Sequence, residues 1–330
     1  MNAPLLQVNN LKVNFIVGKN TQLTAVEDVS FSVEKGKTIG IVGESGCGKS
    51  VTATSIMRLL PKKTGRIVNG SILFKDNDIV QLSEREMCDV RGNLISMVFQ
   101  DPMTALNPVY TIGWQLIEAI RAHDKTVTKT DAYKRSVEVL EKVGIPLPKQ
   151  RMKDYPHQLS GGMRQRVVTA MALLANVELL IADEPTTALD VTIQAQILEL
   201  IAELQDSYRM AVILITHDMG VVSDMADDVL IMYAGEVVEY GDVGSLFRSP
   251  LHPYTFGLLK SIPRLDSDIE ELYTIPGVVP TLSGMPSGCR FSTRCSQCFD
   301  RCKAEKPPLF IHEGRQVRCW KYDEGGTDNE

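Results

Sequence analysis

Apolar and polar residues alternate near the start of the chain. In residues 29–33, valine and phenylalanine alternate with serine, and this period of two predicts a half-buried β-strand. Residues 6–15 and 71–74 also have a strand-like composition. Together these segments predict an antiparallel β portion in the first part of the chain.

Three other short runs, at residues 38–42, 177–182 and 211–216, are apolar almost without interruption. Runs of this kind are typical of strands that are buried on both faces of a parallel sheet. Residues 191–205, between the last two runs, place apolar side chains at helical spacing. The order strand, helix, strand predicts a doubly wound α/β core.

Between about residues 94 and 175 the pattern becomes helical, with candidate helices at 114–122 and 132–143. Pro146 and Pro148 then interrupt it. We therefore expect a helical insertion in the α/β core.

After about residue 251 the composition shifts towards proline, cysteine and basic residues, which indicates a small appended module. The sequence thus predicts a main domain over residues 1–250 and a cysteine-rich module over residues 251–330.

The chain has 330 residues, of which 44% are hydrophobic and 23% charged, so a globular core is expected. A net charge of -6 argues against a general nucleic-acid-binding protein. The first residues lack the basic start and apolar run of a signal peptide. No stretch approaches the roughly 20 apolar residues that cross a bilayer. Any connection to a membrane is therefore expected to come through a partner.

A phosphate-binding loop follows the first of the apolar runs. Residues 43–50 have the sequence G-E-S-G-C-G-K-S and match G-x-x-x-x-G-K-[ST] in full, with a helical stretch after them. Backbone N–H groups of such a loop point at phosphate oxygens, and the following helix adds its positive end. Lys49 is expected to contact the β- and γ-phosphates, and the Ser50 hydroxyl to bind Mg²⁺. The residues expected to bind ATP here are Gly43, Glu44, Ser45, Gly46, Cys47, Gly48, Lys49, Ser50 and Val51.

This loop by itself indicates only nucleotide binding, since kinases, GTPases and helicases share it. Cys47 occupies a variable position of the motif and is interpreted as a tolerated small residue, not a nucleophile. Of the two remaining isolated groups, Cys88 is expected to be a buried thiol and His123 a surface imidazole.

An acidic pair, Asp183 and Glu184, ends the second apolar run. A buried strand delivers both carboxylates to its carboxyl end, where α/β sheets bind ligands. Asp183 is expected to hold Mg²⁺ directly or through water, and Glu184 to orient and deprotonate an attacking water.

Further segments are similar to motifs of the ABC ATPases. Residues 159–166, L-S-G-G-M-R-Q-R, resemble the LSGGQ signature, with Met163 in place of the usual glutamine. Gln100 resembles the Q-loop, residues 188–190 (A-L-D) the D-loop and His217 the switch histidine. The motifs also follow the order of that family, so the chain is identified as a member of it.

The resemblance implies a head-to-tail dimer in which each signature caps the ATP held by the opposite subunit. It implies that His217 bonds the γ-phosphate and that Gln100 contacts Mg²⁺ or the attacking water. Phe15 is similar to the aromatic residue that stacks on adenine, although a lone phenylalanine at a strand end is as often part of a core. The signature residues expected to contact ATP are Ser160, Gly161 and Gly162.

The last third of the chain is similar to the C-terminal region of the oligopeptide and dipeptide (peptide/nickel) importers, in their D-type subunit. The elements that carry this likeness are H-P-Y-T at 252–255, I-P-G at 275–277, P-S-G-C-R-F at 286–291, R-C at 294–295 and R-C at 318–319. The likeness implies a second ATP-binding subunit, two transmembrane permease subunits and an extracytoplasmic peptide-binding protein as partners, and no nucleic acid. It implies a peripheral location on the cytoplasmic face of the cell membrane.

Five of the seven cysteines lie after residue 288, and without an export signal such a cluster favours metal binding over disulfides. In the family that the chain resembles, four tail cysteines hold an iron–sulfur cluster, and by position they correspond to Cys289, Cys295, Cys302 and Cys319. Four thiolates suit a [4Fe–4S] cluster and suit Zn²⁺ almost equally well. Cys298 departs from the family pattern and is a competing ligand. Unliganded thiols are the plain alternative, and a bound group is expected to have a structural role.

The sequence therefore predicts an ATPase subunit that powers import of di- or oligopeptides. One alternative is the same role for nickel, glutathione or antimicrobial peptides. A soluble ABC ATPase of DNA repair or translation is a second, but those carry long coiled coils or tandem cassettes. A non-catalytic subunit is disfavoured because both Glu184 and His217 are present.

Overall fold

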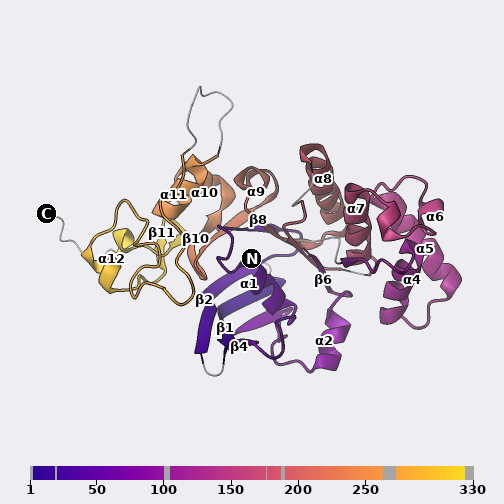
Figure 1. Ribbon diagram of the computed structural model, residues 1–330, viewed down its shortest axis with the longest axis horizontal. Coiled ribbons are helices and arrows are strands. Elements are labelled where there is room, and N and C mark those ends of the chain that lie inside the picture. Colours follow the sequence, from indigo (N-terminus) through magenta and orange to yellow (C-terminus); the bar gives the residue numbers. More distant parts are fainter. Residues whose placement is uncertain are drawn as a thin grey trace. The chain divides into compact units, whose positions relative to one another are not determined.

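The computed structural model describes residues 3–18, 21–99, 105–175, 177–186, 190–262 and 273–323. The chain divides into two compact units. Unit 1 consists mainly of residues 81–213, together with 34–37. Unit 2 consists of residues 4–33, 38–80 and 214–330. Figure 1 shows the course of the chain through these elements.

The alternating segments at the start form an antiparallel sheet in unit 2, as predicted. Its strands, in the order β2-β1-β4-β5, are β2 (Thr21–Val33), β1 (Leu6–Val17), β4 (Gly65–Phe74) and β5 (Asn77–Asp78). Val8 of β1 lies opposite Phe31 on one side and Ile72 on the other, and all three side chains are buried. The apolar positions of the period-two pattern therefore face one core.

A second group of strands in unit 2 carries the apolar run at 38–42. β3 (Thr38–Val42) is buried along its whole length and pairs in parallel with β9 (Asp228–Tyr233). Three further strands continue from β9 in antiparallel order: β10 (Glu236–Asp242), β12 (Arg315–Val317) and β11 (Phe310–His312). Burial on both faces explains why β3 shows no alternation.

Residues after 250 add to the same core. Tyr254 and Phe291 pack with Ile231 and Tyr233 of β9 in one buried cluster. The helices of unit 2 are α1 (Lys49–Ile56), α9 (Met219–Met225), α10 (Val243–Arg248), α11 (Pro253–Lys260), α12 (Asp300–Ala304) and the 3₁₀ turn η2 (Trp320–Tyr322).

Unit 1 is mostly helical, and Figure 1 shows α4 to α7 gathered together in it. Its helices are α2 (Glu84–Val90), α4 (Ile112–His123), α5 (Lys129–Lys142), α6 (Pro148–Arg151), the 3₁₀ turn η1 (Pro156–Gln158), α7 (Gly161–Ala172) and α8 (Val191–Tyr208). Thr111 and Thr128 cap α4 and α5 by accepting bonds from backbone N–H groups of the first turn. The helices predicted at 114–122, 132–143 and 191–205 are confirmed.

Two strands, β6 (Ile95–Val98) and β7 (Leu179–Asp183), pair in parallel in unit 1. The expectation of a helical pattern from about residue 94 is wrong for this segment. Its four residues are all buried, and a run this short has no period that separates a strand from a helix. β8 (Ala211–Thr216) has the predicted bounds, and the division between the two units falls within it.

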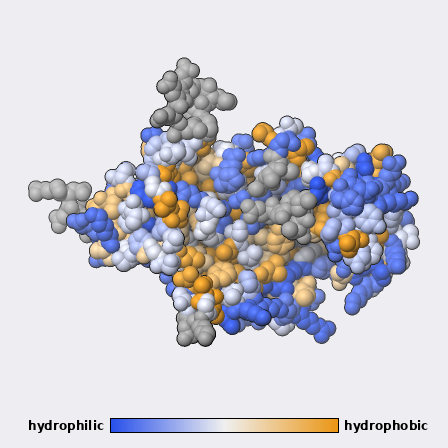
Figure 2. Space-filling view, in the orientation of Figure 1, coloured by the Kyte–Doolittle hydropathy of each residue, from blue (hydrophilic) through white to orange (hydrophobic). Residues whose placement is uncertain are grey.

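Within the described ranges, no helix combines the length and apolar character that a bilayer crossing needs. On the face drawn in Figure 2, the region of α4 to α6 is largely hydrophilic.

Candidate functional site

The predicted phosphate loop connects β3 to α1 in unit 2. Lys49, the first residue of α1, is only 5% exposed. Its Nζ donates to the carbonyl oxygens of Gly43, at 2.6 Å, and Glu44, at 3.2 Å. The ammonium group therefore lies inside the loop and is bonded to its first two residues. Gly48 takes the N-cap position with φ of 102° and no side-chain cap, a conformation that suits glycine.

The loop passes very close to the backbone of β9. A Cβ added at Gly43 would lie 2.2 Å from the carbonyl oxygen of Met232 and 2.6 Å from the Cys47 sulfur. Cys47 is 1% exposed, and burial raises the pKa of its thiol, so it remains neutral and packed. This fits its interpretation as a small residue of the motif.

The acidic pair lies at the carboxyl end of β7 in unit 1. Asp183 is 4% exposed, and Glu184 directly after it has φ of 46°. A non-glycine residue with a positive φ is uncommon and gathers at functional positions. Nε2 of Gln165 donates to the carbonyl oxygen of Pro185 at 2.7 Å, which ties the chain after Glu184 to α7.

The signature segment begins α7 in the same unit. Ser160 is the N-cap, with its hydroxyl oxygen accepting a bond from the Met163 N–H at 3.3 Å, and Gly161 is the first helical residue. Both are exposed. A Cβ added at Gly162 would lie 2.8 Å from Cγ2 of Ile193, so the glycine lets α7 approach the first turn of α8.

The remaining predicted nucleotide-site residues lie in other elements or are not described. His217 is exposed directly after β8, and Asp218 caps α9. Phe15 is half-buried in β1, with its ring against Gly65. Gln100, Ala188 and Leu189 lie outside the described residues.

The four predicted ligand cysteines of the tail line one small cavity. Its lining contains Cys289, Cys295, Cys302 and Cys319 together with His252 and Phe291, but not Cys298. Burial raises the pKa of Cys289 to about 12, and the pKa of Cys319 is raised for the same reason. Across the described ranges, no group of three or more His, Cys, Asp or Glu side chains has the arrangement of a metal site.

Two partners of the phosphate loop were not predicted. Arg294 binds the Glu44 carboxylate through both ends of its guanidinium, at 2.6 and 3.0 Å. The hydroxyl oxygen of Tyr254 accepts a bond from the Glu44 N–H at 2.9 Å. The sequence shows Arg294 next to Cys295, but nothing near it in sequence indicates that it pairs with Glu44.

Of the two isolated side chains, His123 is exposed, as predicted. Cys88 is also exposed, so the expectation of a buried thiol is wrong. It lies in α2, where Met87 is the buried residue.

Two family models match the chain. The ABC transporter model matches residues 26–187, and the model for the oligopeptide/dipeptide transporter C-terminal region matches residues 238–302. The two matches cover the phosphate loop, the signature, the acidic pair and three of the four cavity cysteines.

Among curated relatives, the oligopeptide transport ATP-binding protein AppD of Bacillus subtilis is 52% identical over 99% of this chain and 99% of its own length. The dipeptide transport ATP-binding protein DppD of the same organism is 52% identical over 97% of this chain and 95% of its own length.

Among solved structures, the dimeric post-hydrolysis state of the ATP-binding cassette MJ0796, bound to ADP and Pi, has a TM-score of 0.64 at 26% identity. It covers 72% of this chain and 98% of its own. The structure of cbiO1 from Clostridium perfringens, part of an ABC transporter complex, has a TM-score of 0.63 at 27% identity, over 75% of this chain and 92% of its own. With two relatives identical at half of their positions over nearly their full length, the chain belongs to the oligopeptide/dipeptide transport ATP-binding proteins of the ABC transporter family.

Proposed function

We propose that this chain is the ATP-binding and ATP-hydrolysing subunit of an importer that carries di- or oligopeptides across the cytoplasmic membrane. The observation that carries the proposal is the phosphate loop between β3 and α1, with Lys49 buried across it. The names of the relatives support the peptide cargo.

In the proposed reaction, the backbone N–H groups of the loop and the Lys49 ammonium hold the β- and γ-phosphates. Ser50, Asp183 and Gln100 would hold Mg²⁺, which neutralises charge that develops on the phosphates. Glu184 orients the attacking water and accepts its proton, and His217 bonds the γ-phosphate. The positive φ of Glu184 sets the direction in which its side chain leaves the backbone at the end of β7.

The signature is proposed to act on a neighbouring subunit. Ser160 is exposed at the start of α7, so its hydroxyl and the first N–H groups of the helix can face an anion on another chain. ATP would then close a dimer with a second ATP-binding subunit, and hydrolysis would open it. Phe15 is proposed to stack on the adenine.

The proposed assembly has two transmembrane permease subunits and an extracytoplasmic peptide-binding protein, with this chain at the cytoplasmic face of the membrane. The proposed organisation keeps an ATP-binding domain over residues 1–250, an insertion over about 94–175 that is helical after β6 and contacts the permease, and a C-terminal region over 251–330. The same role for nickel, glutathione or antimicrobial peptides remains the alternative.

Replacing Glu184 tests the ATPase. Glu184→Gln is expected to lower the hydrolysis rate by at least about a hundredfold while ATP still binds, because the amide cannot accept a proton. Glu199→Gln, an exposed position on α8, is the matched control and is expected to hydrolyse ATP at the wild-type rate. A Glu184→Gln variant with unchanged hydrolysis contradicts the proposed mechanism.

The cargo is tested in cells that lack the gene for this chain. With the wild-type chain restored, they are expected to grow on defined di- and oligopeptides as the sole source of a required amino acid. The Glu184→Gln variant is expected not to restore growth. Growth that depends on the chain only when nickel or glutathione is limiting would assign the alternative cargo.

We propose further that Cys289, Cys295, Cys302 and Cys319 hold a [4Fe–4S] cluster, with Zn²⁺ as the alternative. The type of donor supports the proposal, because four thiols line one cavity that Cys298 does not line, although the described side chains do not have the arrangement of a metal site. When bound, such a group would cross-link the segments that carry the four cysteines. The shared cavity supports this assignment and does not distinguish iron from zinc.

Metal analysis of the purified chain tests the cysteine assignment. Cys302→Ser is expected to lower the bound iron or zinc at least about fivefold, because a thiolate ligand is lost. Cys298→Ser, the matched control, is expected to keep the wild-type metal content. Equal metal content in the two variants, or loss in Cys298→Ser alone, would contradict the ligand set.

A further inference from the structure

The phosphate loop is bound by an arginine of the C-terminal region. Nη1 of Arg294 lies 2.6 Å from one carboxylate oxygen of Glu44, and Nη2 lies 3.0 Å from the other. The Arg294 side chain is 4% exposed and that of Glu44 29%. A bidentate pair of this kind fixes the orientation of both partners as well as their distance.

Arg294 is itself held in place. Its Nε donates to the carbonyl oxygen of Pro276 at 2.9 Å, and its Nη2 also donates to that of Ile275 at 3.2 Å. The guanidinium carbon lies 5.8 Å from the centre of the Tyr233 ring. These contacts hold the Arg294 guanidinium in one orientation, in which it binds Glu44.

The residue that Arg294 holds is in direct contact with the predicted phosphate ligand. The carbonyl oxygen of Glu44 accepts a bond from Nζ of Lys49 at 3.2 Å. The N–H of Glu44 donates to Tyr254. The Glu44 carboxylate, carbonyl and N–H are therefore all occupied, and its position affects that of Lys49.

The turn after β9 contacts the loop at Cys47, and an arginine of the C-terminal region contacts that turn. The N–H of Gly235 donates to the carbonyl oxygen of Cys47 at 2.9 Å. Arg290 donates to the carbonyl oxygen of Ala234, one residue earlier, and pairs with Glu236 at 2.9 Å. The loop is thus supported at both Glu44 and Cys47.

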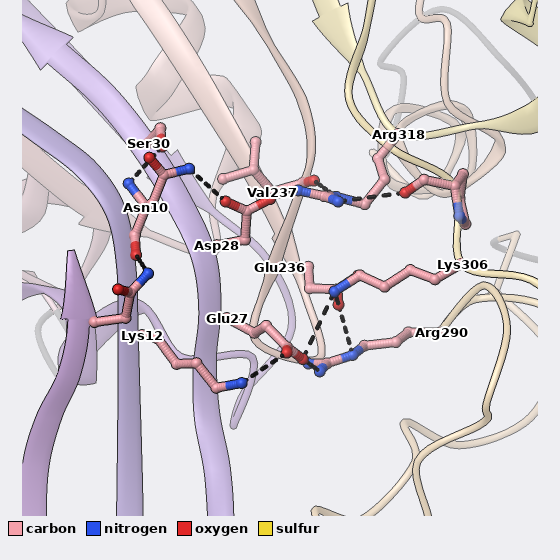
Figure 3. A network of polar contacts seen from close by, with 12 residues as sticks. Asn10, Lys12, Glu27, Asp28, Ser30, Glu236, Val237, Arg290, Lys306 and Arg318 are labelled. Atoms are coloured by element: carbon pink, nitrogen blue, oxygen red, sulfur yellow. Dashed lines mark hydrogen bonds and ion pairs between the residues drawn. The ribbon is translucent and has the colours of Figure 1, made fainter.

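The supporting arginines are neighbours of the cavity cysteines in sequence. Arg290 follows Cys289, Arg294 precedes Cys295, and Arg318 precedes Cys319. The cysteines line the cavity, whereas the arginines pair with carboxylates from the first 50 residues of the chain, Glu27, Glu44 and Asp28. Figure 3 shows Arg290, Lys306 and Arg318 reaching Glu27, Glu236 and Asp28. The backbone that orders the cysteines therefore also orders the arginines.

Charge gives Arg294 a second effect. Glu44 places a carboxylate in a loop that is built to receive a triphosphate. Without a cation beside it, this carboxylate would repel the phosphates, and the repulsion would weaken with added salt. The pairing both neutralises Glu44 and fixes its backbone.

We infer that Arg294 is a positioning residue of the ATP site, which holds Glu44 and so keeps the phosphate loop ready for the nucleotide. The inference rests on the proposed ATP-binding function. It means that the affinity for ATP depends on a residue of the cysteine-containing region, outside every ATP-binding motif.

Nucleotide affinity of the full-length chain tests the inference. Arg294→Gln is expected to raise the Kd for Mg²⁺-ATPγS about tenfold at low salt, which corresponds to about 1.4 kcal/mol. The increase is expected to shrink at about 0.5 M salt, which a purely structural defect would not do. In steady-state hydrolysis, KM for ATP should rise more than kcat falls.

Three further variants make the test specific. In a Glu44→Gln background, Arg294→Gln is expected to change Kd by less than about twofold, because no carboxylate is left unpaired. Arg294→Lys is expected to give an intermediate Kd, because a lysine makes one contact in place of two. Arg301→Gln is the matched control, since Arg301 lies in the same region but pairs with Glu305 and Asp323, and its Kd is expected to equal the wild-type value.

An unchanged Kd in a folded Arg294→Gln variant overturns the inference while the proposed function stands. If Arg294→Gln does not fold, Arg294→Lys decides: a raised Kd supports the inference, and a wild-type Kd overturns it. A wild-type chain that binds no ATPγS removes the proposed function, and the inference with it.

Discussion

At the scale of single residues, the phosphate loop depends on Gly43 having no side chain. A Cβ there would meet the backbone oxygen of Met232, which cannot rotate away as a side chain can. The loop would have to move, and Lys49, which donates to the Gly43 carbonyl, would move with it.

Gly43→Ala is therefore expected to raise the Kd for ATP more than about tenfold and to destabilise the chain by about 1–3 kcal/mol. Gly36→Ala provides the comparison: Gly36 has φ of 75°, but no atom lies within 4 Å of an added Cβ. That variant is expected to lose about 1 kcal/mol through backbone strain and to bind ATP normally. Titration with a nucleotide and thermal unfolding measure the two effects. Equal ATP affinities for both variants would contradict the steric argument.

The residues of the loop were predicted because the motif is local in sequence and its chemistry follows from the residue types. The partners of Glu44 were not predicted, because they lie far away in the sequence; Arg294 is 250 positions from Glu44. An ion pair of that separation depends on the fold and leaves no periodic trace. The exposure of Cys88 was missed for a related reason, since residue type alone does not tell which side of a short helix faces solvent.

At the scale of elements, α7 and α8 approach each other through Gly162. The nearest atoms to an added Cβ belong to the side chain of Ile193, so the two positions are expected to be coupled.

Gly162→Ala is expected to lower the unfolding temperature by a few degrees, corresponding to about 1–3 kcal/mol of overpacking. Adding Ile193→Ala should restore part of the loss, because it removes the atoms that clash. The four unfolding temperatures form a double-mutant cycle. Strictly additive effects would show that the helices do not meet at this pair.

Elements were predicted best where burial is complete. β3 and β8 have the predicted bounds because every residue in them is buried. β12 was missed, since the charge of its buried Arg315 is compensated by distant partners, the carbonyl oxygen of Ser249 at 2.7 Å and the carboxylate of Glu239 in β10 at 3.4 Å. A pattern of apolar residues does not show that such bonds offset the cost of burying an arginine.

At the scale of the whole molecule, carboxylates of β2 and β10 bind the basic residues of the tail. Burial acts to raise the pKa of Glu27, but the hydrogen bond from Lys12 and the charges of Lys306 and Arg290 outweigh it and lower the pKa below 4.5. The pKa of Asp28 is lowered below 3.8 in the same way, with Arg318 among its partners. A carboxylate with a lowered pKa stabilises the folded chain above its unfolded value and loses this effect as the pH falls through the folded value.

The wild-type chain is therefore expected to have a higher unfolding temperature than Glu27→Gln at pH 6. This difference is expected to shrink as the pH falls below about 4.5. Glu141→Gln, at an exposed position on α5, is expected to follow the wild-type curve. Thermal unfolding between pH 3 and 6 measures all three. A difference between wild type and Glu27→Gln that stays constant over this range would contradict the ion-pair explanation.

The position of Tyr254, Arg290 and Arg294 has a consequence for anyone who transplants this ATPase into a chimeric transporter. Residues 1–250 contain every motif expected to touch ATP, and a cut after them would look complete. Such a fragment would keep the groups that are expected to bind the nucleotide and lose those that hold Glu44 and the turn beside Cys47. The portable unit therefore extends at least to Arg294, whatever cargo the new transporter carries.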